Sequence, residues 1–237
     1  MKAAKLILCL ILMTSVRPIF AQPSESFTEK ARKAHAYMSS GQIDKALPLI
    51  DDLLKEDPTN YQILQYAGYI FAVQGKYQEA QNYFDRCIQA VIAQSSDSNP
   101  VLGDCYMYRA KCGYSIGNYP DSILYYKKAH DIFVASKGLN SKEAAACLYE
   151  IGNSSYSLGD LKTAQDSFQK ALEIRKQVYG EDSVECAQCY TYLGMLSFSS
   201  ANYDDALELY KKSLAITSKK LGENSPSTAT CYYTVGT

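Results

Sequence analysis

Cysteine is the residue type whose spacing in this sequence first suggests chemistry. Cys186 and Cys189 form a CxxC pair, a spacing used for zinc ligation and for thiol–disulfide exchange. The sequence has no second CxxC pair and no nearby histidine to complete a metal site. The pair also falls inside a run of apolar residues with helical periodicity. We therefore predict neither a zinc site nor a redox site here, and no bound metal.

The other cysteines follow a regular spacing. Cys105, Cys147, Cys189 and Cys231 recur at intervals of 42 residues, whereas Cys9 lies near the N-terminus. Equivalent positions on stacked helices lie about 8–10 Å apart, and the Cα atoms of a disulfide lie within about 7 Å. We expect the cysteines that follow Cys9 to be small packing residues in the core. Adding a reductant should then leave the stability of the protein nearly unchanged.

Histidine offers little support for catalysis. His35 and His130 are the two histidines, and neither has an acidic partner at helical spacing. A serine or cysteine nucleophile needs a neighbouring base, and the sequence contains no HExxH or GxxxxGK motif. The net charge is −1, and no basic cluster of the kind that binds nucleic acid is present. We predict that the chain is not an enzyme, takes no cofactor and does not bind nucleic acid.

A repeated pattern positions these residues. Three segments of about 22 residues, which begin at Tyr119, Leu161 and Tyr203, carry small and aromatic residues at matching positions. Within each segment, apolar residues recur at steps of three and four, as in an amphipathic helix. Fixed self-similarity of this length indicates a tandem repeat. The sequence therefore predicts an all-α solenoid without strands.

The N-terminus differs from the rest of the chain. Two lysines precede the apolar run "LILCLILM", and Ala21 stands before a polar stretch. A positive start, a short apolar run and a small residue at the cleavage position are typical of a secretory signal peptide. We expect residues 1–21 to be this signal peptide and the protein to be exported to the periplasm, the cell surface or the medium. A membrane anchor or a misplaced start codon remain alternatives.

The small and aromatic residues of each unit form a series that matches a known repeat. One unit contains Gly152, Gly159, Ala164, Phe168 and Ala171, and the other units repeat this spacing. The series resembles the tetratricopeptide repeat (TPR), in which each helix–turn–helix unit uses these positions. The resemblance implies a right-handed all-α superhelix. The 42-residue spacing and the junction "LGENSPSTA" resemble the kinesin-light-chain type of TPR, here in an exported, bacterial-style protein.

The resemblance also divides the chain. A short lead at residues 22–26 precedes five repeats, and the beginning of a sixth follows at residues 229–237. The expected repeats are residues 27–60, 61–102, 103–144, 145–186 and 187–228. Because the sixth unit stops within its first helix, we expect the sequence to be truncated. A genuine end of the protein is the alternative.

A TPR superhelix binds peptides in a concave groove lined by the first helix of each unit. The resemblance therefore implies a groove formed by Gln65, Tyr69, Met107, Lys111, Tyr149, Asn153, Gln188 and Met195. Asn153 matches a position where peptide-binding TPRs place an asparagine that holds the ligand backbone. The clamp of several Lys and Arg residues used by chaperone-type TPRs is missing. Alternatively, groove aromatics such as Tyr114, Tyr156 and Phe198 only pack between helices.

These observations favour one function and leave a second open. The first is a non-catalytic, exported scaffold that binds a peptide or protein segment in the groove and has no membrane span. The second is the N-terminal sensor or substrate-docking region of a larger protein, such as a CHAT-type peptidase or a membrane signalling protein. The sequence identifies neither the ligand nor the oligomeric state.

Overall fold

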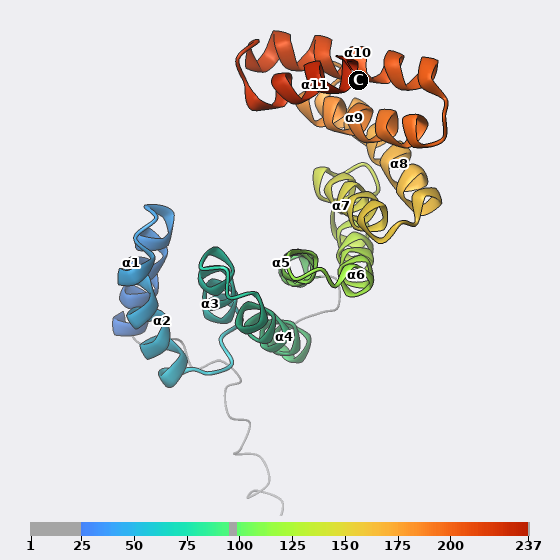
Figure 1. Cartoon of the computed structure of the whole chain (residues 1–237). Coiled ribbons are helices and arrows are strands. Elements are labelled where there is room, and N and C mark those ends of the chain that lie inside the picture. The colour runs from blue at the N-terminus through green and yellow to red at the C-terminus, as the bar shows by residue number, and fades with distance from the viewer. Residues whose placement is uncertain (1–24, 95–98, 237) are drawn as a thin grey trace, which may run out of the picture. The chain divides into compact units, whose positions relative to one another are not determined.

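The computed structural model of the chain describes residues 25–94 and 99–236. The regular structure of these residues is α-helix only, so the prediction of an all-α fold is confirmed within them. Figure 1 shows the helices as successive antiparallel pairs. They are α1 (Glu25–Ser39), α2 (Ile43–Glu56), α3 (Tyr61–Val73), α4 (Tyr77–Gln94), α5 (Pro100–Ser115), α6 (Tyr119–Lys137), α7 (Lys142–Leu158), α8 (Leu161–Tyr179), α9 (Val184–Ser199), α10 (Tyr203–Leu221) and α11 (Pro226–Gly236).

The described part of the chain divides into two compact units, of which the first ends at Leu53 and the second begins at Leu54. In the first unit, α1 and α2 bury small and aliphatic side chains that include Ala34, Ala46 and Ile50. In the second unit, each helix from α3 to α11 contacts the next helix in the chain. The second unit is therefore a continuous stack of helix pairs, and it contains all eight residues predicted to form a groove.

The turns between pairs follow the 42-residue register. Helices α6, α8 and α10 each end at a glycine with positive φ, and at Gly180 this angle is +87°. Glycine adopts this backbone conformation without the steric cost that a Cβ would add. The next helix then begins at a serine, and the hydroxyl of Ser183 accepts a hydrogen bond from the backbone N–H of Cys186. The predicted helix ends at Gly180 and Gly222 are confirmed.

Small residues let the two helices of a pair approach closely. A Cβ on Gly152 would lie 2.8 Å from the ring of Phe168, and a Cβ on Gly194 would lie 2.6 Å from the ring of Tyr210. Phe168 is fully buried. A bulkier residue at Gly152 would therefore force the helices apart. The close approach also fixes how the first helix of each pair presents its other side chains.

One expectation about the cysteines is wrong. Cys87 of α4 and Cys105 of α5 form a disulfide, with their Cα atoms 6.7 Å apart. Cys87 lies outside the 42-residue cysteine series, and the helix packing places it opposite Cys105 on the neighbouring repeat. Cys87 and Cys105 are not equivalent positions, so the 8–10 Å spacing of equivalent positions on stacked helices does not separate them. The other cysteines of the described chain are buried and lie outside this disulfide, as expected: Cys112, Cys147, Cys186, Cys189 and Cys231.

Two further properties concern membranes and metals. None of the helices in the described part of the chain combines the length and apolarity needed to cross a bilayer. Over the same residues, no group of three or more His, Cys, Asp or Glu side chains is arranged to hold a metal ion.

The predicted signal peptide at residues 1–21 lies outside the described residues. The predicted repeat starts at 103, 145 and 187 fall within the first turn of α5, α7 and α9.

Candidate functional site

All eight predicted groove residues lie on the first helices of successive pairs in the second unit. The 42-residue register places most of them in two rows of equivalent positions. One row is Gln65, Met107 and Tyr149, and the other is Tyr69, Lys111, Asn153 and Met195. Gln188 lies on α9, outside these rows. The structure distributes these residues between two pockets and the helix interfaces.

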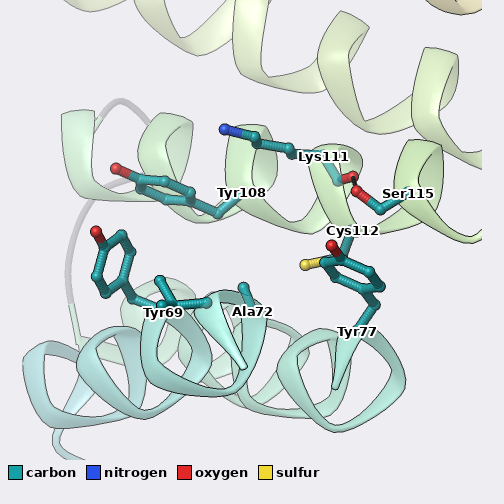
Figure 2. A pocket seen from close by; sticks show the side chains of 8 residues that line it. Tyr69, Ala72, Tyr77, Tyr108, Lys111, Cys112 and Ser115 are labelled. Carbon is teal, nitrogen blue, oxygen red and sulfur yellow. Dashed lines mark hydrogen bonds between the residues drawn. The ribbon is translucent and has the colours of Figure 1, made fainter. Parts of the chain in front are cut away.

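The first pocket, which we call the tyrosine pocket, lies between α3, α4 and α5 and has a volume of about 260 Å³. Figure 2 shows the rings of Tyr69 and Tyr108 next to each other, with Tyr77 and Cys112 toward the other end. The two neighbouring rings meet edge to face, with their centroids 6.2 Å apart. The pocket is lined by Tyr69, Ala72, Val73, Tyr77, Tyr108, Lys111, Cys112 and Ser115.

The tyrosine pocket carries a single charge at neutral pH. Burial, together with the neighbouring Asp104 and Tyr69, raises the pKa of the Tyr108 phenol. Burial raises the pKa of the Cys112 thiol to about 11, against the opposing effect of nearby cations. Both groups therefore stay neutral, and among the described residues that line this pocket Lys111 is the one cation. Such a pocket accommodates an apolar or aromatic group next to a hydrogen-bond acceptor.

The second pocket, which we call the hydroxyl pocket, lies between α7, α9, α10 and α11 and has a volume of about 250 Å³. The hydroxyls of Thr191 and Ser213 lie 2.8 Å apart, and Ser213 also donates to the backbone carbonyl of Ala187 at 2.9 Å. This pocket offers uncharged polar groups. It is lined by Tyr149, Val184, Gln188, Thr191, Tyr192, Met195, Ser213, Thr217, Ser227 and Cys231.

A buried arginine holds two of the predicted groove residues. Arg175 of α8 is only 6% exposed, and its guanidinium lies 4.2 Å from the centroid of the Tyr149 ring. The same group donates hydrogen bonds to the backbone carbonyl of Glu185 at 2.6 Å and to the side-chain oxygen of Gln188 at 3.3 Å. Tyr149 also meets the ring of Phe168 at 5.5 Å. Tyr149 is therefore a packing residue with one edge in the hydroxyl pocket.

Asn153 interacts with a neighbouring carboxylate. Burial raises the pKa of Glu150, while a hydrogen bond from Asn153 and the charges of Lys111 and Arg175 act in the opposite direction. Asn153 lines neither pocket, and its amide forms a hydrogen bond with the carboxylate of Glu150. A ligand backbone that reached Asn153 would have to compete with this internal hydrogen bond.

The remaining two predicted residues have different surroundings. Met107 packs against two buried clusters, one that contains Tyr126 and Ile151 and one that contains Phe133, so it belongs to the helix interface. Gln65 is partly exposed on α3 and lines neither pocket.

Sequence reasoning missed several residues that shape the two pockets. Tyr108 and Tyr192 line them, and Glu150 stands between these two in the 42-residue register. Tyr108 stacks on Phe84 with a centroid distance of 5.6 Å, and Tyr192 stacks on Phe168 at 4.7 Å. The 42-residue register could have identified both tyrosines, because they occupy equivalent positions two repeats apart. Tyr108 directly follows the predicted groove residue Met107, and Tyr192 follows the equivalent residue Thr191.

Solved structures with the same fold support the assignment of the architecture. BtubC (BKLC) from P. vanneervenii has a TM-score of 0.66 and 17% identity, over 90% of this chain and 83% of that chain. TPR-like repeats assigned to a kinesin light chain of Podosopora anserina have a TM-score of 0.69 and 13% identity, over 83% and 96%. YrrB, described as a TPR protein with an unusual peptide-binding site, has a TM-score of 0.60 and 18% identity, over 83% and 95%. At these identities the likeness shows the fold.

Family profiles lead to the same class. Two profiles described as tetratricopeptide repeat match residues 32–95 and 144–217. The chain therefore belongs to the tetratricopeptide repeat family, and the all-α TPR superhelix is its fold class. The search among curated proteins found no match. The TPR fold commonly mediates contacts between proteins, which fits an array with pockets on the first helices of its pairs.

Proposed function

We propose that the second unit is a non-catalytic binding module that holds an extended segment of another protein along the first helices of its repeats. The observation that carries this proposal is the placement of two pockets on those helices. Five of the eight groove residues predicted from sequence line them: Tyr69 and Lys111 in the tyrosine pocket, and Tyr149, Gln188 and Met195 in the hydroxyl pocket.

The chemistry of the two pockets defines what such a segment would offer. Neutral aromatic walls in the tyrosine pocket suit an apolar or aromatic side chain. Hydroxyl and amide groups in the hydroxyl pocket suit the polar groups of a peptide backbone. Because Lys111 is the single cation among the described residues that line the tyrosine and hydroxyl pockets, long-range attraction to an acidic ligand contributes little. Binding should therefore depend only weakly on salt. YrrB provides a precedent for peptide binding on this fold.

The experiment is to select peptides from a displayed random library with the purified protein and to titrate the best binder. Replacing Tyr69, which is 39% exposed, by alanine should weaken binding about 5- to 100-fold, the range for an interface hot spot. Tyr203 is 60% exposed on α10 and lines neither pocket, so Tyr203→Ala is the matched control and should bind normally. Equal affinities of both variants, or release by moderate salt, would place the site elsewhere.

We also propose that the mature protein works outside the cytoplasm. The signal-peptide pattern of residues 1–21 supports export. The Cys87–Cys105 disulfide supports it independently, because disulfides persist in oxidising compartments. N-terminal sequencing of the protein from its native host tests this proposal. The sequence should begin at Gln22 in the exported fraction, and an intact protein beginning at Met1 in the cytoplasm would refute export.

A further inference from the structure

The junction between α4 and α5 differs from the other junctions between repeats. Its two facing positions hold Cys87 and Cys105, which are joined by the disulfide, and both side chains are fully buried. The same positions one, two and three repeats later hold a single cysteine opposite a small residue. These equivalent pairs are Ala129 with Cys147, Ala171 with Cys189, and Ser213 with Cys231. The last pair is in contact, with the hydroxyl oxygen and the sulfur 3.3 Å apart.

The sequence of this junction also differs from that of the later junctions. The turns after α6, α8 and α10 use Gly138, Gly180 and Gly222 in a positive-φ conformation. In the sequence, Ser96 stands at the corresponding position between α4 and α5. A loop glycine stabilises the other turns, because it satisfies the last carbonyls of the helix without a Cβ clash.

The disulfide lies on the same helix face as the tyrosine pocket. Cys105, Tyr108 and Cys112 are spaced three and four residues apart on α5, so they share one face. Phe84 lies one turn before Cys87 on α4 and stacks on Tyr108 at 5.6 Å. The ring of Phe84 also packs against α3, since a Cβ on Gly68 would lie 2.7 Å from it. Phe84 of α4 therefore contacts both α3 and α5, so a shift of α5 against α4 would also move it relative to α3.

We propose that the Cys87–Cys105 disulfide sets the width of the tyrosine pocket. Tyr69, Ala72 and Val73 of α3 form one wall, and the α5 residues form the opposite wall. Reduction by a dithiol breaks the S–S bond, transfers two electrons and two protons to give two thiols, and leaves the dithiol as a disulfide. With the link broken, α5 is held to α4 by non-covalent contacts such as side-chain packing and the Arg109–Asp85 ion pair, and the pocket opens more often. Binding at this pocket then depends on the redox state of the pair.

Cys112 is a built-in probe of this opening. It lines the pocket, is only 2% exposed and is a free thiol. Alkylation by iodoacetamide therefore requires local opening of the pocket. The rate is measured at fixed pH by mass spectrometry of digested protein, first for the oxidised chain and then for Cys87→Ala. This variant recreates the alanine–cysteine pair found at Ala129 and Cys147, so it should fold.

Two controls separate local opening from general loosening. Cys189 is a buried free thiol on α9, and its alkylation rate should not change in Cys87→Ala. The variant Ala129→Cys, which places a second cysteine opposite Cys147, should leave Cys112 as slow as in the oxidised wild type. If Cys87→Ala does not fold, Cys105→Ala and dithiol-reduced wild type provide the same comparison.

The expected result is alkylation of Cys112 about tenfold faster or more when the bridge is lost, with Cys189 unchanged. An unchanged Cys112 rate, an equal rise at Cys189, or free Cys87 and Cys105 thiols in protein purified without reductant would overturn the inference. The inference rests on the proposed function in treating the pocket as a ligand site. Because alkylation needs no ligand, a failure here can be distinguished from a failure of peptide binding.

Discussion

The α4–α5 and α8–α9 junctions occupy equivalent places in the repeat but are held together differently. At the first, a disulfide joins the helices, and Arg109 pairs with Asp85 at 3.0 Å and Asp121 at 2.7 Å. At the second, Ala171 faces Cys189, and Leu193 occupies the position of Arg109. The first junction is thus covalent and ionic, whereas the second combines apolar packing with the hydrogen bonds that Arg175 of α8 donates to Glu185 and Gln188.

This difference shows which positions the repeat constrains and which it leaves open. A glycine on the first helix contacts an aromatic ring on the second at equivalent positions in three pairs, where the close approach of the helices leaves no room for a Cβ: Gly68 with Phe84, Gly152 with Phe168 and Gly194 with Tyr210. At equivalent positions that face the next repeat, by contrast, the chemistry of the side chain differs from one repeat to another. Phe133 and Arg175 are equivalent and both buried, yet one is apolar and the other carries a charge over Tyr149. Function can therefore change along the array without a change of fold.

The largest expected effect concerns the covalent junction. Cys87→Ala should lower the free energy of unfolding by about 3 kcal/mol, the value for closing a loop of this length, since the two cysteines are 18 residues apart in sequence. Urea unfolding of the oxidised protein measures the loss. Reductant should destabilise the wild type by the same amount and leave the variant unchanged. If reductant destabilised the wild type and the variant equally, the effect could not come from the Cys87–Cys105 disulfide.

The second prediction places the phenylalanine found at position 133 at the equivalent position 175. Phe133 fits because Gly103 lacks a Cβ, which would lie 2.8 Å from its ring, whereas Ala145 and Arg175 stand at the equivalent positions one repeat later. Arg175→Phe should lower stability by about 1–3 kcal/mol, because it overpacks the pair and removes the hydrogen bonds that Arg175 donates to Glu185 and Gln188. Adding Ala145→Gly should recover the steric part of this loss. Thermal unfolding of both variants measures the coupling, and additive losses would contradict the proposed steric cause.

The third prediction makes the first junction resemble the later ones. Arg109→Ile introduces the residue found at position 151 and should cost about 1 kcal/mol, because Asp85 and Asp121 keep partial access to water. The cost should shrink as salt is added. Arg32→Ile is the control, since Arg32 is 75% exposed in its pair with Glu29 and should have little effect. A loss that does not change with salt would indicate packing instead of charge.

The smallest effect concerns Glu150 of α7, whose equivalent positions on α5 and α9 hold Tyr108 and Tyr192. Its pKa is raised above 4.5 by burial, so its contribution to stability is present below pH 4.5 and is lost as pH rises through the folded-state pKa. Glu150→Gln should therefore raise the melting temperature slightly at pH 7 and have less effect at pH 4. Glu208→Gln, at an exposed carboxylate, should not. A fall in melting temperature at pH 7 would mean that Lys111 and Arg175 outweigh burial.

Much of the fold could be predicted from sequence because its determinants are local and repeated. The helical periodicity, the loop glycines and the serine at the start of α9 each act within a few residues. The pairing of Cys87 with Cys105 could not, because it depends on which faces of α4 and α5 meet. The burial of Arg175 was missed for a related reason: a charged residue interrupts the apolar pattern that identifies the core. Predicting the groove from first helices found Tyr69 and Lys111 but not Tyr108.

The central claim is that a partner segment binds in the tyrosine pocket. Fluorine NMR of protein labelled with 3-fluorotyrosine at its 21 tyrosines tests this claim directly, with resonances assigned from Tyr→Phe variants. Titration with the selected peptide should shift the signals of Tyr69 and Tyr108 and leave that of Tyr203 unchanged. Shifts at Tyr203 without any change at Tyr69 and Tyr108 would contradict the claim.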